Sequence, residues 1–136
     1  MEHRNYAYML KDVIVGDFKY AWDQEVLWEK AASKTVATYK MNDVKHWVYR
    51  PCWSRGKCLV SIYQVLLQPK LFANHAKRID KADTKYPLIV VQDEFDKYGV
   101  ILDGNHRFAK LVLNNKRNVK VVKFTTKELE RLRISM

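Results

Sequence analysis

Five consecutive residues of this chain combine side chains that could do chemistry. Asp103-Gly104-Asn105-His106-Arg107 place a carboxylate, a glycine, an amide, an imidazole and a guanidinium side by side. The apolar run before them predicts a strand, and apolar residues at helical spacing after them predict a helix. Unpaired backbone N–H groups at a helix start attract anions, phosphate above all. The sequence therefore predicts an anion site at this turn.

Each of the five residues has a role that suits such a site. The guanidinium of Arg107 matches phosphate oxygens, although it could also pair with a nearby carboxylate. His106 could donate to a phosphate or transfer a proton, or it could simply bond a backbone carbonyl. Asp103 could orient water, hold Mg²⁺ or cap the helix. Asn105 could bond a phosphate, and Gly104 permits close backbone approach. We therefore treat Asp103 and His106 as the candidate catalytic pair.

Residues outside the turn could complete the site. His75 and Arg78 lie three apart on a predicted helix, where they could add to a phosphate pocket or form a solvated edge. Glu94 lies in an acidic predicted turn and could share a metal ion with Asp103. Turns are also acidic for ordinary conformational reasons, so both interpretations stay open.

The charge of the chain indicates a polyanionic partner. The 136 residues carry a formal net charge of +10, and from residue 107 onward nine basic residues face two glutamates. Such a balance favours contact with DNA or RNA, the alternative being a merely basic surface. Residues 49–57 interleave aromatic and basic side chains, which could form a stacking platform or a loop that plugs the core. The candidate nucleic-acid contacts are Lys110, Lys116, Arg117, Lys120 and Lys123.

The patterning predicts one α+β domain over residues 1–136, with residues 1–56 as an N-terminal extension packed on a core of residues 57–136. We expect a small mixed β-sheet flanked by helices. Strands are expected at residues 13–15, 58–60, 88–91, 98–102 and 119–124. Helices are expected after Asp23, from residue 42 or 43 to 47, after Ser61, at 71–82, at 105–113, and after Thr125 with Glu128 as a capping box and Ile134 on the helix. Strand 98–102 should be antiparallel to 88–91 and parallel to 119–124.

The remaining composition narrows the class of protein. Two cysteines, Cys52 and Cys58, are too few for a closed zinc site. No stretch approaches the length of a membrane span, and the polar start of the chain is unlike a signal peptide. We therefore expect a cytoplasmic protein with reduced thiols and no membrane contact.

The order of elements from Cys58 to Leu132, together with Asp103-Gly104-Asn105-His106-Arg107, resembles the ParB/sulfiredoxin-like superfamily. The resemblance implies that the phosphates of a nucleotide, ATP or CTP with Mg²⁺, bind at this turn and helix start. It implies one of several activities, because branches of the superfamily act as phosphotransferases, NTPases or nucleases.

The turn departs from the two best-known branches of that superfamily. Asn105 stands where sulfiredoxins carry their catalytic cysteine, which argues against sulfur reduction. The glutamate of the partition proteins is also missing, and the chain is too short for their additional DNA-binding domains. The nearest pattern is the Asp-Gly-X-His-Arg form, which is seen in the kinase branch and in many small uncharacterised members of the superfamily.

Three functions remain as hypotheses. The first is an NTP-dependent phosphotransferase or NTPase. The second is a DNA- or RNA-binding protein or a metal-dependent nuclease of the same fold. The third is an interaction protein that has kept the fold without the activity, with its aromatic first part as the partner surface.

Overall fold

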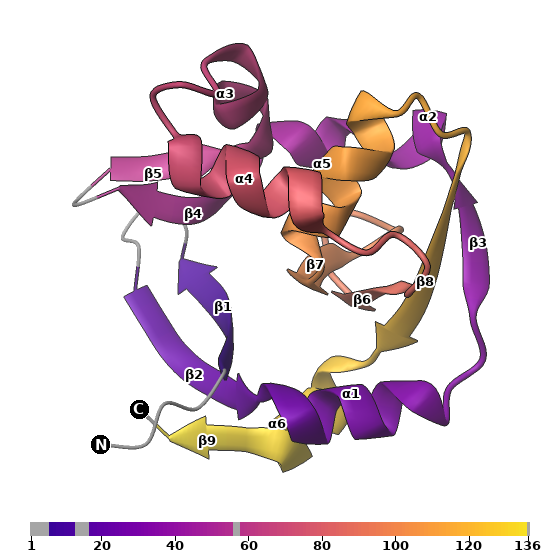
Figure 1. Cartoon of the computed structure of the whole chain (residues 1–136). Coiled ribbons are helices and arrows are strands. Elements are labelled where there is room, and N and C mark those ends of the chain that lie inside the picture. Colours follow the sequence, from indigo (N-terminus) through magenta and orange to yellow (C-terminus); the bar gives the residue numbers. More distant parts are fainter. Residues whose placement is uncertain (1–5, 13–16, 56–57, 136) are drawn as a thin grey trace.

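A four-stranded mixed sheet forms the centre of the structure, a computed structural model that describes residues 6–12, 17–55 and 58–135 (Figure 1). Its strands, in spatial order, are β3 (Ala37–Lys40), β8 (Asn118–Phe124), β6 (Leu88–Val91) and β7 (Val100–Asp103). Strand β8 runs parallel to β6 and antiparallel to β3, and β6 forms an antiparallel hairpin with β7. The expected α+β class with a small mixed sheet is confirmed.

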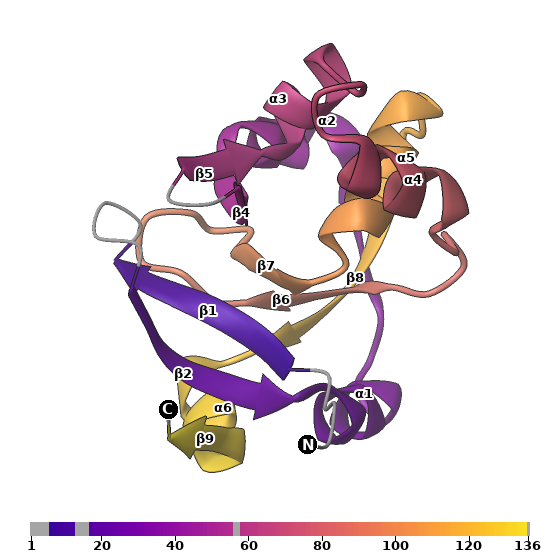
Figure 2. The same cartoon turned by 60° about the vertical axis from the view of Figure 1, so that its left-hand side comes forward.

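Helices cover both faces of this sheet. On one side lie α3 (Ile62–Leu67), α4 (Ala73–Lys81) and α5 (Asn105–Leu113), and on the other lie α1 (Gln24–Ala32) and α6 (Thr126–Leu132) (Figures 1 and 2). A short helix α2 (Met41–Val44) continues into the 3-10 turn η1 (Lys45–Tyr49). Because both faces are covered, all four residues of β6 are buried, as its continuous apolar run predicts.

Two apolar cores result. The larger core lies under α3, α4 and α5 and contains Trp47, Phe108 and Val121, which are at most 2 % exposed. The smaller core lies under α1 and α6 around Leu27 and Phe124. Residues from the first third of the chain thus contribute to both cores.

Two further small sheets complete the chain. One contains β1 (Tyr6–Asp12), β2 (Asp17–Asp23) and β9 (Arg133–Ser135), all antiparallel. The other is the hairpin of β4 (Pro51–Arg55) and β5 (Cys58–Ser61). None of the helices within the described ranges combines the length and the apolar character that a membrane span requires.

Three of the local capping signals that the sequence predicts are confirmed. The Asp23 carboxylate accepts from the backbone N–H of Glu25 at the start of α1. Ser61 and Gln64 form a capping box at α3. Thr125 and Glu128 form the predicted capping box at α6.

Three predictions about elements were wrong in detail. Strand β8 pairs with β6 rather than with β7, and because it is parallel to β6 it runs antiparallel to β7, so the connection through α5 does not join two parallel strands. Ile134 belongs to β9 and not to α6. The short helix begins at Met41, without a side-chain cap. Residues 51–55, for which the sequence left a stacking platform and a loop open, form a strand.

Two further predictions concern the region before residue 57, namely its first strand and its role as an N-terminal extension. Residues 13–15 lie outside the described residues. Strand β3 is an edge strand of the central sheet, so the region before residue 57 supplies part of the core fold rather than only covering it.

Candidate functional site

The turn before α5 is built around Gly104, whose backbone takes the left-handed region at φ 109°. The first helical hydrogen bond runs from the Phe108 N–H to the Gly104 carbonyl, at 2.8 Å. The backbone N–H groups of Asn105, His106 and Arg107 precede it and have no hydrogen-bond partner among the described residues. The helix start therefore offers the free donors that the sequence predicts.

Asp103 attaches this turn to α1. One carboxylate oxygen accepts from Gln24 Nε2 at 2.9 Å, and the other accepts from the indole Nε1 of Trp28 at 2.8 Å. No side-chain hydrogen bond caps α5, so the capping role considered for Asp103 is wrong. Its carboxylate holds α1 against the end of β7 and fixes the orientation of the Trp28 ring.

Arg107 attaches the same turn to the loop that precedes β6. Its Nε donates to the carbonyl of Asp83 at 2.8 Å and its Nη1 donates to that of Pro87 at 3.0 Å. The guanidinium also lies 5.8 Å from the centroid of the Tyr86 ring, within cation–π range. No described residue accepts from Nη2, so part of the phosphate-binding fork remains available.

The imidazoles of His75 and His106 meet between α4 and α5. Nδ1 of His75 and Nε2 of His106 are 3.0 Å apart, so one ring donates to the other. The indole of Trp53, on β4, stacks on both rings, with centroid separations of 4.3 Å to His75 and 4.5 Å to His106. Three elements thus converge on the first turn of α5.

This environment keeps both imidazoles neutral. Burial, the nearby His75 and the positive charge of Arg78 lower the pKa of His106 to about 4. Burial and Arg78 also lower the pKa of His75. At neutral pH His106 is therefore a hydrogen-bonding and proton-accepting group rather than a cation.

A cavity of about 600 Å³ opens beside the turn, between α1 and the loop before β6. Both Asp103 and Arg107 line it, and Trp28 and Tyr86 supply aromatic surface. Most of the remaining lining is aliphatic. This volume lies within the range of small-molecule sites, which are mostly apolar with a few placed polar groups.

No family model, no curated protein and no solved structure matches the chain.

The structure does not bring Glu94 to Asp103. Glu94 lies in the turn that joins β6 to β7, next to the Val91–Val100 pair, whereas Asp103 pairs with Ile89 at the other end of the hairpin. A metal ion held by both carboxylates is therefore incompatible with this hairpin. Among the described residues, no three histidine, cysteine or acidic side chains gather as a metal site.

The predicted basic contacts separate into two groups. Lys110 donates to the carbonyls of Asp80 and Ala82 and thereby holds the end of α4, and Lys123 donates to the carbonyl of Lys97. These two lysines have structural partners. Lys116, Arg117 and Lys120 are exposed, and their side chains have no ion-pair or hydrogen-bond partner among the described residues.

Sequence reasoning missed the residues of α1 and identified Trp53 only as one of several aromatics. Nothing in the sequence connects Gln24 and Trp28 with Asp103, because the contact depends on how α1 packs under the sheet. Trp53 could have been singled out from the sequence, because it lies in the segment that interleaves aromatic and basic residues.

Proposed function

We propose that the protein binds a nucleotide, ATP or CTP, at the first turn of α5 and acts on its phosphates as a phosphotransferase or NTPase. The observation that carries the proposal is the cavity beside that turn, which Asp103 and Arg107 line together with Trp28 and Tyr86. Aromatic faces suit a nucleobase, and free helix-start amides with a guanidinium suit phosphates. The resemblance to the ParB/sulfiredoxin-like superfamily supports the same assignment.

The phosphate-binding part of the proposal rests on the three unpaired N–H groups of residues 105–107 and on Nη2 of Arg107. Mg²⁺ fits the protein side less well, because both oxygens of Asp103 already accept hydrogen bonds from α1. A magnesium ion that enters with the nucleotide would take its ligands from phosphate oxygens and water.

The chemical step assigned to the protein is a proton transfer at His106. Its imidazole is neutral at pH 7 and lies on the turn proposed to hold the phosphates. It can accept the proton of the hydroxyl or water that attacks a phosphate, while His75 orients the ring. A base with a pKa near 4 is weak, but phosphoryl transfer depends mainly on positioning and charge stabilisation.

Isothermal titration calorimetry with ATP and CTP, with and without Mg²⁺, tests the binding step. The Ala32→Trp variant places an indole in the cavity from the exposed face of α1, and Val26→Trp places the same ring on α1 outside the cavity lining. We expect binding to the unmodified protein, at least about tenfold weaker binding to Ala32→Trp, and unchanged binding to Val26→Trp. Absence of binding by both nucleotides overturns the proposal, and so does equal binding to both variants.

Turnover is tested separately from binding. His106→Gln keeps a hydrogen-bonding group of similar length but cannot take up a proton at neutral pH. Release of phosphate from the bound nucleotide should fall by about a hundredfold in this variant, while the dissociation constant changes little. Unchanged turnover would contradict the assignment of His106.

A further inference from the structure

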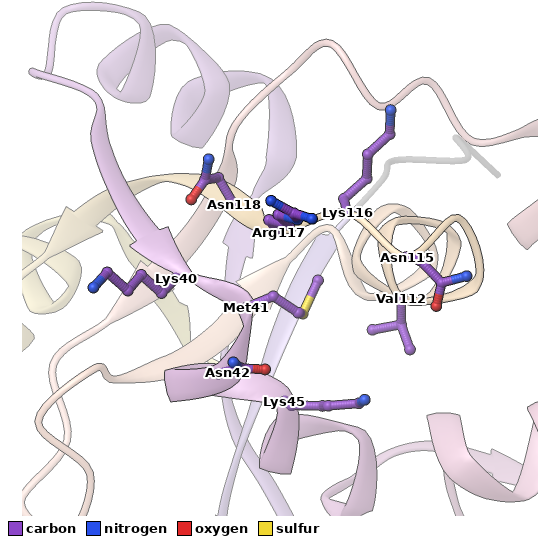
Figure 3. Close-up of a pocket in the computed structure, with 9 residues that line it drawn as sticks. All are labelled: Lys40, Met41, Asn42, Lys45, Val112, Asn115, Lys116, Arg117 and Asn118. Carbon is purple, nitrogen blue, oxygen red and sulfur yellow. The ribbon is translucent and has the colours of Figure 1, made fainter.

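A second concave site lies at the far end of α5, away from the turn just described. It is a cavity of about 510 Å³ where the end of β3 and the start of α2 meet the turn between α5 and β8 (Figure 3). We call it the basic pocket. Its lining residues are Lys40, Met41, Asn42, Lys45, Val112, Asn115, Lys116, Arg117 and Asn118.

The charge of the basic pocket has one sign. Four of the nine lining residues are Lys or Arg, and none is acidic. These four side chains come from both sides of the pocket, and no described residue forms an ion pair or a side-chain hydrogen bond with any of them. Asp43, also on α2, is exposed and is not among the lining residues. Unpaired cations around a concavity raise the local concentration of anions.

The backbone fixes the shape of the basic pocket. The Met41 N–H donates to the Arg117 carbonyl at 2.7 Å, which joins its two sides. Asn115 follows the end of α5 with φ 53°, and the N–H groups of Asn115 and Lys116 donate back to the carbonyls of Val112 and Leu111. This C-terminal motif satisfies two carbonyls that would otherwise repel an anion. Lys116 and Arg117 are therefore presented by a fixed turn.

The polar part of the lining suits a nucleotide unit better than phosphate alone. Asn42, Asn115 and Asn118 present amides, which carry both donors and acceptors and can pair with base edges. Buried Met41 and partly buried Val112 add apolar surface for a base or sugar. In a duplex the base edges lie inside grooves, so a concave site reaches them only on an unpaired strand.

The cationic surface continues beyond the basic pocket along the sheet. Lys40 pairs with Asn118, and Thr38 pairs with Lys120, so these four side chains lie on one face of the β3–β8 ladder. All four are exposed. A chain of phosphates that leaves the pocket would find Lys120 on this path.

From these observations we infer that the basic pocket binds single-stranded nucleic acid, with one unstacked nucleotide in the cavity and the neighbouring phosphates on Lys45, Arg117 and Lys120. This site is separate from the nucleotide site proposed at the first turn of α5.

Fluorescence anisotropy with a labelled single-stranded RNA, the same sequence as DNA, and the DNA duplex tests the inference over a series of salt concentrations. The Lys45→Gln/Arg117→Gln variant removes two pocket cations. Lys127→Gln/Arg131→Gln on α6 removes two exposed cations elsewhere and gives the same net charge. We expect about tenfold weaker single-strand binding for the pocket variant, and a slope of log K against log salt that is shallower by about 1.4. The α6 variant should bind within about threefold of the unmodified protein.

The Asn115→Gly variant separates base contact from charge. Glycine tolerates a φ of 53°, so the turn keeps its shape while one amide is lost. Single-strand affinity should fall several-fold with an unchanged salt slope.

Equal losses in the pocket and α6 variants overturn the inference, because they would show a response to net charge only. Duplex binding as tight as single-strand binding overturns it as well. The Ala32→Trp variant should bind the oligonucleotide normally, so this site is tested independently of the nucleotide cavity.

Discussion

Gly104 is the residue on which the geometry of the candidate site depends. A Cβ at this position would lie 2.8 Å from Cδ2 of Leu88 and 3.2 Å from Nη1 of Arg107, in addition to the strain of φ 109°. We expect Gly104→Ala to lower the free energy of unfolding by about 1–3 kcal/mol. Chemical denaturation followed by circular dichroism measures this loss. Asn105→Ala is the control, since it changes a helical residue of the same turn, and an equal loss in both variants would contradict the prediction.

The lowered pKa of His106 makes the stability of the protein depend on pH. Its pKa is about 4 in the folded protein, below the ordinary value of 6.5. The unfolded chain therefore binds more protons between these values, and His106 makes stability fall as the pH drops from 6.5 to 4. After allowance for solvent screening the effect is about 1–2 kcal/mol. Denaturation of His106→Gln should show a shallower decline than the unmodified protein across this window, and parallel curves would refute the assignment.

Side-chain types in the turn could be predicted from the sequence, but their partners could not. The guanidinium of Arg107 indicated a contact with a bound phosphate, yet two of its N–H groups donate to carbonyls of the loop before β6. Asp103 suggested a metal ligand or a cap, yet its oxygens face α1. Each of these partners lies at least 20 residues away in the sequence, so only the packing of the elements brings them together.

Asp96 attaches the β6–β7 hairpin to η1 and to Arg50, the residue that follows it. This buried carboxylate accepts from Nε2 of His46 and from Nη2 of Arg50, both at 2.6 Å, and from the backbone N–H of Tyr98. Burial alone would raise the pKa of Asp96, but the hydrogen bonds from His46 and Tyr98 and the charge of Arg50 outweigh it and lower the pKa. At pH values above the ordinary pKa of an aspartate, this contact therefore contributes its full stabilisation. The stabilisation is lost as the pH falls through the lowered pKa of Asp96.

Removal of this carboxylate should loosen the hairpin as a unit. We expect Asp96→Ala to cost about 2–4 kcal/mol, because it leaves buried donors and a partly buried guanidinium without an acceptor. Glu94→Ala, in the same turn but exposed, should change stability by less than about 0.5 kcal/mol. Thermal denaturation of the two variants provides the comparison. Similar midpoints would show that the turn does not depend on Asp96.

Elements with strong local signals were predictable, whereas their neighbours in the sheet were not. The continuous apolar run of β6, the Gly104 turn and the Ser61 cap each lie within a few residues, and the sequence identifies all three. The pairing of β8 with β6 and β3 depends on long-range packing. The rule that a helix between two strands joins parallel neighbours predicts the wrong partner here, because β6 lies between β7 and β8 and these two strands run in opposite directions.

Charge acts on the molecule as a whole. The formal net charge of +10 on 136 residues means that the folded chain repels itself at low ionic strength. We expect the midpoint of thermal unfolding to rise by a few degrees between roughly 10 mM and 200 mM NaCl, as salt screens this repulsion. Differential scanning calorimetry over that range measures the shift. A midpoint that falls with salt would indicate that favourable ion pairs outweigh the repulsion.

The position of β3 at the edge of the central sheet has a consequence for folding kinetics. Ala37 pairs with Val121, so ribosomal synthesis delivers one strand of this ladder long before the other. Until β8 emerges, β3 has no partner on the sheet, and the apolar side chains around Met41 and Trp47 lack the surface that covers them. Pairing between strands that are far apart in the sequence slows folding. It also prolongs the time in which partly folded intermediates expose apolar surface and can aggregate. The nascent chain therefore depends on its last strands to protect its earliest ones.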